Sequence, residues 1–216
     1  MKIDKNSYGT IALVYLISLI IFIPILIWGG PWAIYPSAVF LLVICVWQTL
    51  FFRVPVREKI GDESTVTAVA DGKIVIIDKV YEKEYLMRDC IQVSIFMDFF
   101  DVHANFWPVT GEVTYYKYYP GKHFLAFLPK ASEDNEHTCT NVRTEEGIDI
   151  FFKQLAGTFA RRIVCYSKDG GSTVAGEQCG IIKFGSRIDM FLPLDAEIEV
   201  ELGQQVRACE TVIARL

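Results

Sequence analysis

The sequence predicts a mainly β protein, in which an N-terminal transmembrane helical hairpin precedes a cytoplasmic domain of barrel-like or sandwich-like architecture. The hairpin is predicted by two uncharged apolar stretches at residues 9–28 and 33–52, each of about 20 residues, the length that spans a bilayer. The β domain is predicted by short runs rich in Val, Ile, Tyr and Phe, separated by turns, from about residue 64 onward. The length of 216 residues suits one medium domain with an anchor.

The two apolar stretches are separated only by a Gly-Gly-Pro-Trp turn at residues 29–32. Lys and Arg flank the outer ends of both stretches and are absent from the turn, and such residues stay on the cytoplasmic side. We therefore expect an anchor over residues 1–53 in the cell membrane, with residues 54–216 in the cytoplasm. A signal peptide is a competing interpretation, but a second apolar run follows at once without a small-residue cleavage pattern. Two buried core helices are another, although these usually carry polar residues on one face.

After the anchor, the elements are expected to be short strands. TVTAVA and KIVIIDKV flank Asp71-Gly72, a pair typical of a β-hairpin turn. Residues 119–140 are expected to form a long loop, and a short helical turn is expected near 157–162. The remaining predicted strands lie at 91–97, 111–119, 148–155, 162–167, 196–202 and 211–216.

Composition excludes several classes of function. The net charge of −5 provides no basic field, so nucleic acid is not an expected partner. None of the six cysteines form a C-x-x-C pair, which suits a reduced cytoplasmic domain. The three histidines do not fall at zinc-site spacing from the cysteines, so no metal site is expected. No Walker or Rossmann pattern is present.

The segment 97–113 offers the first candidate chemistry. Asp101, His103 and Asn105 recur at every second position, which places them on one face of a strand. An Asp near a His commonly fixes the imidazole tautomer and raises its basicity. An exposed strand edge with ordinary polar residues is the alternative, although the surrounding aromatic residues count against exposure.

Other candidate residues are less specific. His123 and His137 lie in the expected long loop, where each alone could be an ordinary surface residue. Arg161 and Arg162 follow a flexible glycine, and an arginine pair can bind a phosphate. A solvated face or pairing with acidic residues is the alternative for these arginines.

The segment KFGSRIDMFLP at 183–193 raises a sharper question, because Gly185-Ser186 interrupts a regular strand alternation. A straight strand would put the Ser186 hydroxyl on an apolar face. A two-residue hairpin with Gly185 in a type II′ turn is the ordinary alternative. The third interpretation is that the Gly185–Ser186 bond is itself reactive. No G-x-S-x-G elbow is present, so Ser186 is not an evident hydrolase nucleophile.

Taken together, six segments resemble the short form of the phosphatidylserine decarboxylases, whose members are pyruvoyl-dependent proenzymes. The segments follow the family's order, and six in register are specific although each alone is weak. They are FFRVPVR at 51–57, AVADGKIV at 68–75, DVHANFWPVTGEV at 101–113, KASEDNEH at 130–137, AGTFARRIV at 156–164 and FGSRIDMFLP at 184–193.

The resemblance implies that the chain cuts itself. The Ser186 hydroxyl would attack the Gly185 carbonyl, and elimination would give a β chain of residues 1–185 and an α chain of 186–216. The α chain would begin with a pyruvoyl group derived from Ser186. This covalent cofactor would form a Schiff base with phosphatidylserine, release CO₂ and yield phosphatidylethanolamine. His103, oriented by Asp101, would transfer the proton.

The resemblance also implies partners: phosphatidylserine in the bilayer and the two chains for each other, with a homo-oligomer left open. Substrate contacts are expected at His137, His123, Arg161 and Arg162. Phe106-Trp107 replaces an Arg that the family often has, and the base for self-cleavage is left open. Two alternative functions remain: a non-enzymatic lipoyl- or biotinyl-like adaptor, favoured by the C-terminal segment, and a decarboxylase of a related lipid such as archaetidylserine.

Overall fold

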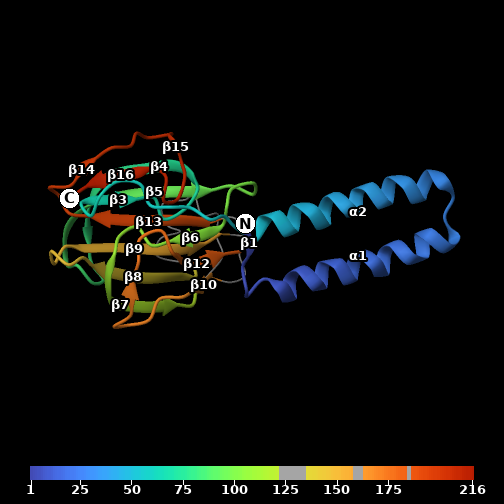
Figure 1. The fold of residues 1–216 in the computed structure, drawn as a ribbon, viewed down its shortest axis with the longest axis horizontal. Helices are drawn as coiled ribbons and strands as arrows, with labels where there is room; N and C mark the ends of the chain where they lie inside the picture. The colour runs from blue at the N-terminus through green and yellow to red at the C-terminus, as the bar shows by residue number, and fades with distance from the viewer. Residues whose placement is uncertain (122–134, 158–162, 184–185) are drawn as a thin grey trace. The chain divides into compact units, whose positions relative to one another are not determined.

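The computed structural model describes residues 1–121, 135–157, 163–183 and 186–216 (Figure 1). It divides into two compact units, Met1–Pro55 and Val56–Leu216. The expected helical turn near 157–162 and most of the expected long loop fall outside the described residues. So do four of the predicted site residues, which are His123, Arg161, Arg162 and Gly185.

The first unit is a helical hairpin. Helices α1 (Tyr8–Trp28) and α2 (Pro31–Phe51) are each long and apolar enough to cross a membrane. Proline is the first residue of α2, where its missing N–H costs no hydrogen bond. The Tyr15 hydroxyl lies 2.8 Å from that of Thr49 and links the helices. Short strands β1 (Lys2–Ile3) and β2 (Arg53–Val54) pair at the hairpin's open end. The predicted apolar helices are confirmed; their membrane sidedness stays a prediction.

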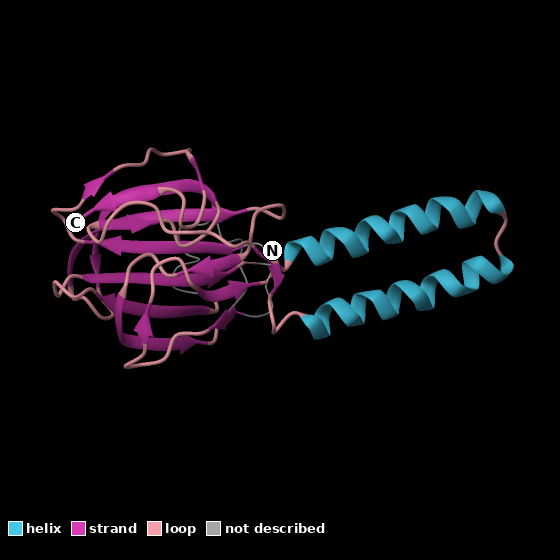
Figure 2. Ribbon diagram, in the orientation of Figure 1, coloured by secondary structure: helices cyan, strands magenta, loops and turns pink. Residues whose placement is uncertain are grey.

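The second unit is built almost entirely from antiparallel strands (Figure 2). Its largest element is a curled sheet of eight strands, a half-barrel in the order β11-β7-β8-β9-β13-β5-β4-β15. The members in chain order are β4 (Gly72–Glu82), β5 (Arg88–Met97), β7 (Gly111–Tyr119), β8 (His137–Arg143), β9 (Asp149–Ala156), β11 (Ser172–Thr173), β13 (Ser186–Leu192) and β15 (Gln205–Val206).

Two smaller sheets complete this unit. One has the order β10-β12-β6, with β10 (Ile163–Cys165), β12 (Gln178–Ile182) and β6 (Ala104–Phe106). The other has the order β14-β16-β3, with β14 (Glu197–Ile198), β16 (Val212–Arg215) and β3 (Thr65–Thr67). The main core covers the inner face of the large sheet and includes Ile95, Phe152 and Ile188. The prediction of a mainly β protein with a barrel-like domain is confirmed in this coarse form.

The predicted Asp71-Gly72 hairpin is wrong. Strand β3 pairs with β16, whereas β4 pairs with β5 and β15, so the two strands flanking Asp71-Gly72 lie in different sheets. The glycine is required by a close approach instead of a tight turn. A Cβ at Gly72 would lie 2.2 Å from the carbonyl oxygen of Phe96, and φ is +150°.

Some of the other strand predictions are confirmed and some are wrong. The strands expected at 111–119 and 148–155 correspond to β7 and β9, and that at 91–97 lies within β5. The run 196–202 contains only the two-residue strand β14. The sequence missed β8, because His137–Arg143 was assigned to a long loop up to residue 140.

Candidate active site

Ser186 is the first residue of β13, in the middle of the large sheet. It lies opposite Met97, the last residue of β5, and Ala156, the last residue of β9. Its side chain is fully buried and shares the inner face with Ile188, a member of the main core. The Ser186 hydroxyl donates to Sδ of Met97 at 3.0 Å, a weak acceptor that leaves the oxygen lone pairs available.

The chain passes from one sheet to another just before Ser186. Strand β12 ends at Ile182 in the small β10-β12-β6 sheet, and β13 begins at Ser186 in the large one. The straight strand and the two-residue hairpin considered from sequence are therefore both wrong, because β12 and β13 neither form one strand nor pair with each other. Ser186 is thus the first residue of the strand that follows the change of sheet.

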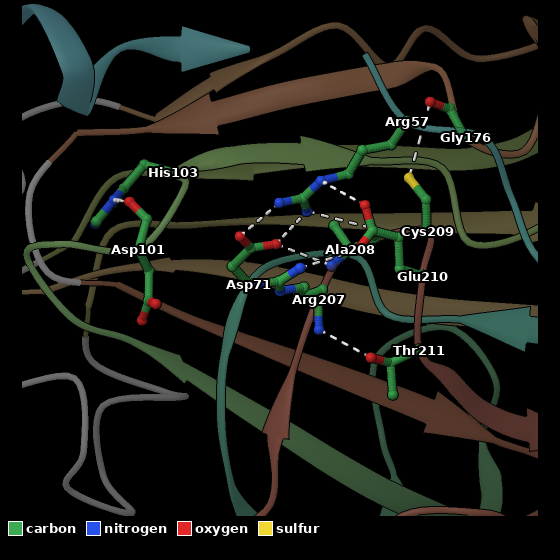
Figure 3. A network of polar contacts seen from close by, with 10 residues as sticks. All are labelled: Arg57, Asp71, Asp101, His103, Gly176, Arg207, Ala208, Cys209, Glu210 and Thr211. Atoms are coloured by element: carbon green, nitrogen blue, oxygen red, sulfur yellow. Dashed lines mark hydrogen bonds and ion pairs between the residues drawn. The ribbon is translucent and has the colours of Figure 1, made fainter. Parts of the chain in front are cut away.

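His103 lies immediately before β6 and is fully buried. Its Nδ1 is 3.0 Å from the main-chain carbonyl oxygen of Asp101 (Figure 3). The His103 carbonyl accepts the N–H of Ile182 at 3.2 Å. A ring N–H that donates to a carbonyl places the proton on Nδ1 and makes Nε2 the basic nitrogen of the neutral ring. The main chain thus sets the tautomer of His103.

The structure differs in one respect from the arrangement that the spacing of Asp101, His103 and Asn105 predicts. Only Asn105 of the three alternating residues lies in a strand, so the expected common strand face is wrong. The Asp101 carboxylate accepts the N–H of Asp98 at 2.9 Å, and its main-chain carbonyl is the group that bonds Nδ1 of His103.

His137 begins β8 and points to the outer face of the large sheet. It is paired with Leu155, which is paired with Arg187, so it faces away from the side that holds Ser186. Nδ1 of His137 is 2.7 Å from the Asn135 carbonyl oxygen, and the ring stacks on Tyr119. Burial lowers the pKa of His137 below its ordinary value of 6.5 and Lys153 adds to this, although the bond to Asn135 opposes it.

The lowered pKa of His137 predicts a loss of stability in acid. Folding favours the neutral ring, so the stability present above the ordinary value of 6.5 is lost as the pH falls through that value and below it. We expect the melting temperature to fall between about pH 7 and about pH 5, and a His137→Gln chain to show a smaller fall over the same range. Calorimetry at matched ionic strength measures the difference, and equal falls in both chains would contradict the prediction.

Charged groups surround His137 on this outer face. Potential ligand atoms of Glu84, His137 and Cys139 lie within 4.8 Å of one another. The ammonium of Lys153 is 3.3 Å from Oε2 of Glu84, and Cys139 donates to the same oxygen at 3.2 Å. The carboxylate that a metal would need is therefore already neutralised by a lysine.

A chain of buried hydrogen bonds lies on the inner face. The Thr138 hydroxyl donates to Oε1 of Gln154 at 2.8 Å, and Nε2 of Gln154 donates to Oδ1 of Asn105 at 2.7 Å. These three side chains, named here the amide relay, come from β8, β9 and β6. The alternation of Asp101, His103 and Asn105 in the sequence carries no signal for the partners of Asn105, because they are far away in the chain.

Comparison with known proteins decides the family. The model of the family described as phosphatidylserine decarboxylase matches residues 46–214, well over half of the chain. The chain belongs to the phosphatidylserine decarboxylase family. The resemblance inferred from the six sequence segments is thereby confirmed.

Relatives within the phosphatidylserine decarboxylase family cover the chain from end to end. A phosphatidylserine decarboxylase proenzyme of Parabacteroides distasonis is 40% identical over all of this chain and 99% of its own length. One from Phocaeicola vulgatus is 41% identical over all of this chain and 96% of its own. One from Amoebophilus asiaticus is 46% identical over 79% of this chain and 76% of its own. These matches support the enzyme and not the adaptor alternative.

The AVADGKIV segment, one of the six that resemble the decarboxylase family, supplies a second buried polar cluster. Asp71 forms a two-point ion pair with Arg57, in which Nη2 donates to Oδ2 at 2.8 Å, and Oδ1 of Asp71 accepts the N–H of Ala208 at 2.9 Å (Figure 3). Arg57 also donates to the Ala208 carbonyl at 3.2 Å. The cluster connects the start of the domain to its C-terminal part. No pattern in the sequence predicted it.

This cluster is expected to stabilise the decarboxylase fold. The side chains of Arg57 and Asp71 are 9% and 12% exposed, so Arg57→Met would leave a buried carboxylate without its cation, at a cost of about 3 to 5 kcal/mol. Arg215→Met is the matched control, because the side chains of Arg215 and Glu199 are 48% and 33% exposed, so water screens the pair and its loss should cost far less. Urea unfolding measures both, and equal losses would contradict the prediction.

Proposed function

We propose that this chain is a membrane-anchored phosphatidylserine decarboxylase, made as a proenzyme that cuts itself between Gly185 and Ser186. One observation carries the proposal. In a chain that matches decarboxylase proenzymes over its whole length, Ser186 is a buried, inward-facing serine at a junction between two sheets.

Self-cleavage needs a hydroxyl that can attack the preceding carbonyl. The Ser186 oxygen bonds to the carbonyl carbon of Gly185 and loses its proton to a base. The Gly185–Ser186 C–N bond then breaks as its nitrogen takes up a proton, which leaves an ester and a free amine. Removal of the Cα proton of residue 186 expels the Gly185 carboxylate and forms dehydroalanine. Water then replaces its nitrogen, which leaves as ammonia, and a pyruvoyl group caps the new chain. The weak bond from Ser186 to Met97 leaves the hydroxyl free to turn toward its target.

The fold is suited to surviving this cut. Strand β13, which would start the α chain, is registered with β5 over seven residue pairs and with β9 over six. Strand β13 lies wholly on the C-terminal side of the cut, and its partners β5 and β9 lie wholly on the N-terminal side. The α chain therefore stays hydrogen-bonded in the centre of the sheet after the peptide bond is gone.

The residues near position 186 fit a pyruvoyl group, because Met97, Ala156 and Ile188 form an apolar, buried wall that excludes water. The ketone of that group supplies the electron sink for the substrate amine as CO₂ leaves. His103 would hold or deliver the proton at Nε2, with Nδ1 fixed by the Asp101 carbonyl. His137, His123, Arg161 and Arg162 remain predictions as substrate contacts.

The anchor suits a lipid substrate. Helices α1 and α2 would hold the domain at the surface of the bilayer, so that phosphatidylserine is reached by diffusion in the membrane plane. The basic residues at both ends of the hairpin favour the cytoplasmic side.

The direct test is an intact-mass spectrum of the purified, denatured wild-type protein, together with an assay on phosphatidylserine vesicles. We expect two chains, the smaller beginning at position 186 with a blocked N-terminus that reacts with hydroxylamine, and formation of phosphatidylethanolamine. A single full-length chain with no lipid turnover would overturn the proposal.

A further inference from the structure

The amide relay ends in Nδ2, the side-chain nitrogen of Asn105. Asn105 is fully buried, and its Nδ2 has no hydrogen-bond partner within the part of the chain that the structure describes. Leaving a buried donor unsatisfied is costly, and the few such groups in native proteins commonly mark a place where a ligand or water binds.

The direction of the relay fixes which atom is left over. Oδ1 of Asn105 is occupied by Nε2 of Gln154, and Oε1 of Gln154 is occupied by the Thr138 hydroxyl. The remaining atom, Nδ2, is therefore a neutral N–H donor. Hydrogen bonds in a chain polarise one another, and the bond from Gln154 fixes the orientation of the Asn105 amide before a ligand arrives.

The relay lies beside Ser186. Gln154 is opposite Ile188 on β13 and two residues before Ala156, which is opposite Ser186, so Gln154 and Ser186 share the inner face as diagonal neighbours. Diagonal neighbours in a sheet are about 7 to 8 Å apart. Asn105 follows His103 by two residues and contacts Gln154 directly. Asn105 is thus joined through Gln154 to the part of the sheet that holds Ser186, and it is two residues from His103 in the chain.

We propose that Nδ2 of Asn105 donates a hydrogen bond to an anionic oxygen of the substrate's serine headgroup, with Gln154 and Thr138 as positioning residues. The inference rests on the proposed function. An anionic oxygen is the expected acceptor, because an N–H donor held in place bonds a charged acceptor more strongly than a neutral one, and Met97, Ala156 and Ile188 on the same face make the surroundings apolar. The carboxylate and the phosphodiester of phosphatidylserine both carry such oxygens. Either group could accept a charge-assisted hydrogen bond from Nδ2 of Asn105.

Two variants test the donor without removing the fold. Asn105→Ala deletes it. Gln154→Glu keeps the shape of the relay but presents an acceptor to Asn105, so the Asn105 amide turns its N–H toward residue 154 and its oxygen toward the substrate. Asn141→Ala is the matched control, since Asn141 is an equally buried asparagine whose Nδ2 bonds Thr114 and Asp149 on the outer face.

We expect all three variants to be cut, as judged by intact mass. Asn105→Ala and Gln154→Glu should raise KM for phosphatidylserine about tenfold or more, while Asn141→Ala should not. The inhibition constant of phosphatidylethanolamine, which has the phosphodiester but no carboxylate, separates the sources. If it is unchanged, the bond is to the carboxylate, and if it rises in parallel, the bond is to the phosphodiester.

An unchanged KM in Asn105→Ala or in Gln154→Glu would overturn the inference, as would a defect confined to chain cleavage. Borohydride can reduce the imine that the phosphatidylethanolamine amine forms with the small chain, which is seen as an increase in the mass of that chain. This control checks that each variant still has its reactive ketone. Failure of the proposed function would be seen in the wild-type chain itself, which would then make no phosphatidylethanolamine.

Discussion

A Ser186→Ala chain is expected to remain a single full-length polypeptide and to make no phosphatidylethanolamine. Alanine removes the only atom that attacks Gly185 in the proposed cleavage, and without cleavage no ketone is formed at position 186. We expect decarboxylation to fall by at least about a thousandfold, as when a covalent nucleophile is deleted. Intact mass and product formation from labelled phosphatidylserine measure the two effects separately.

Ser94→Ala is the matched control for this experiment. Ser94 is another fully buried serine of the same sheet, on the neighbouring strand β5, but it faces the outer side and donates to Asp189 at 2.6 Å. Its loss should leave cleavage intact. Full activity in the uncut Ser186→Ala chain would show that the reaction does not depend on a group made from this residue.

The second large effect is expected at His103. In His103→Ala, the turnover of already cleaved protein should fall by about a hundredfold to ten-thousandfold, because proton transfer in the transition state loses its side chain. Single-turnover kinetics on the isolated two-chain fraction measure this step, so that any slower self-cleavage does not enter the result.

His103→Asn separates chemistry from structure. Its amide N–H can keep the bond to the Asp101 carbonyl that the Nδ1 of histidine makes, but it has no basic nitrogen. Both variants should therefore be equally impaired, and the pH dependence of turnover that belongs to the imidazole should disappear in both. Activity retained in His103→Asn alone would assign this residue a structural role.

Local sequence signals predicted the elements whose residues determine their own environment. The apolar run 9–28 and helix α1 (Tyr8–Trp28) differ by one residue at the start, because an uncharged stretch of that length has few alternatives. Strand β7 (Gly111–Tyr119) was also predicted with its observed bounds, since its β-branched and aromatic residues suit a sheet.

Elements fixed by distant partners were not predictable in this way. Asp71-Gly72 has the composition of a tight turn, yet Asp71 is bound by Arg57 and Gly72 is required by the carbonyl of Phe96. Strand β8 contains Thr138 and Thr140, which are polar but buried. Their hydroxyls form hydrogen bonds with Gln154 and Ser167. A polar residue satisfied inside a fold looks like a loop residue in the sequence.

The same division holds for the site. Ser186 could be proposed from the sequence because its motif is continuous in the chain, whereas the amide relay joins three strands and has no motif. The carbonyl of Asp101, and not its carboxylate, bonds Nδ1 of His103, a detail that residue types do not encode. Main-chain geometry decided that contact.

The position of β13 between β5 and β9 has a consequence for how the protein recovers from unfolding. The precursor carries both ladders on one chain, so its folding is a unimolecular process that does not depend on protein concentration. After the proposed cut between residues 185 and 186, the central strand would belong to a separate small chain. Refolding then requires two chains to meet, and its rate falls with dilution. The folded two-chain protein would then depend on slow unfolding for its lifetime. A denatured sample would refold its large sheet only at high protein concentration.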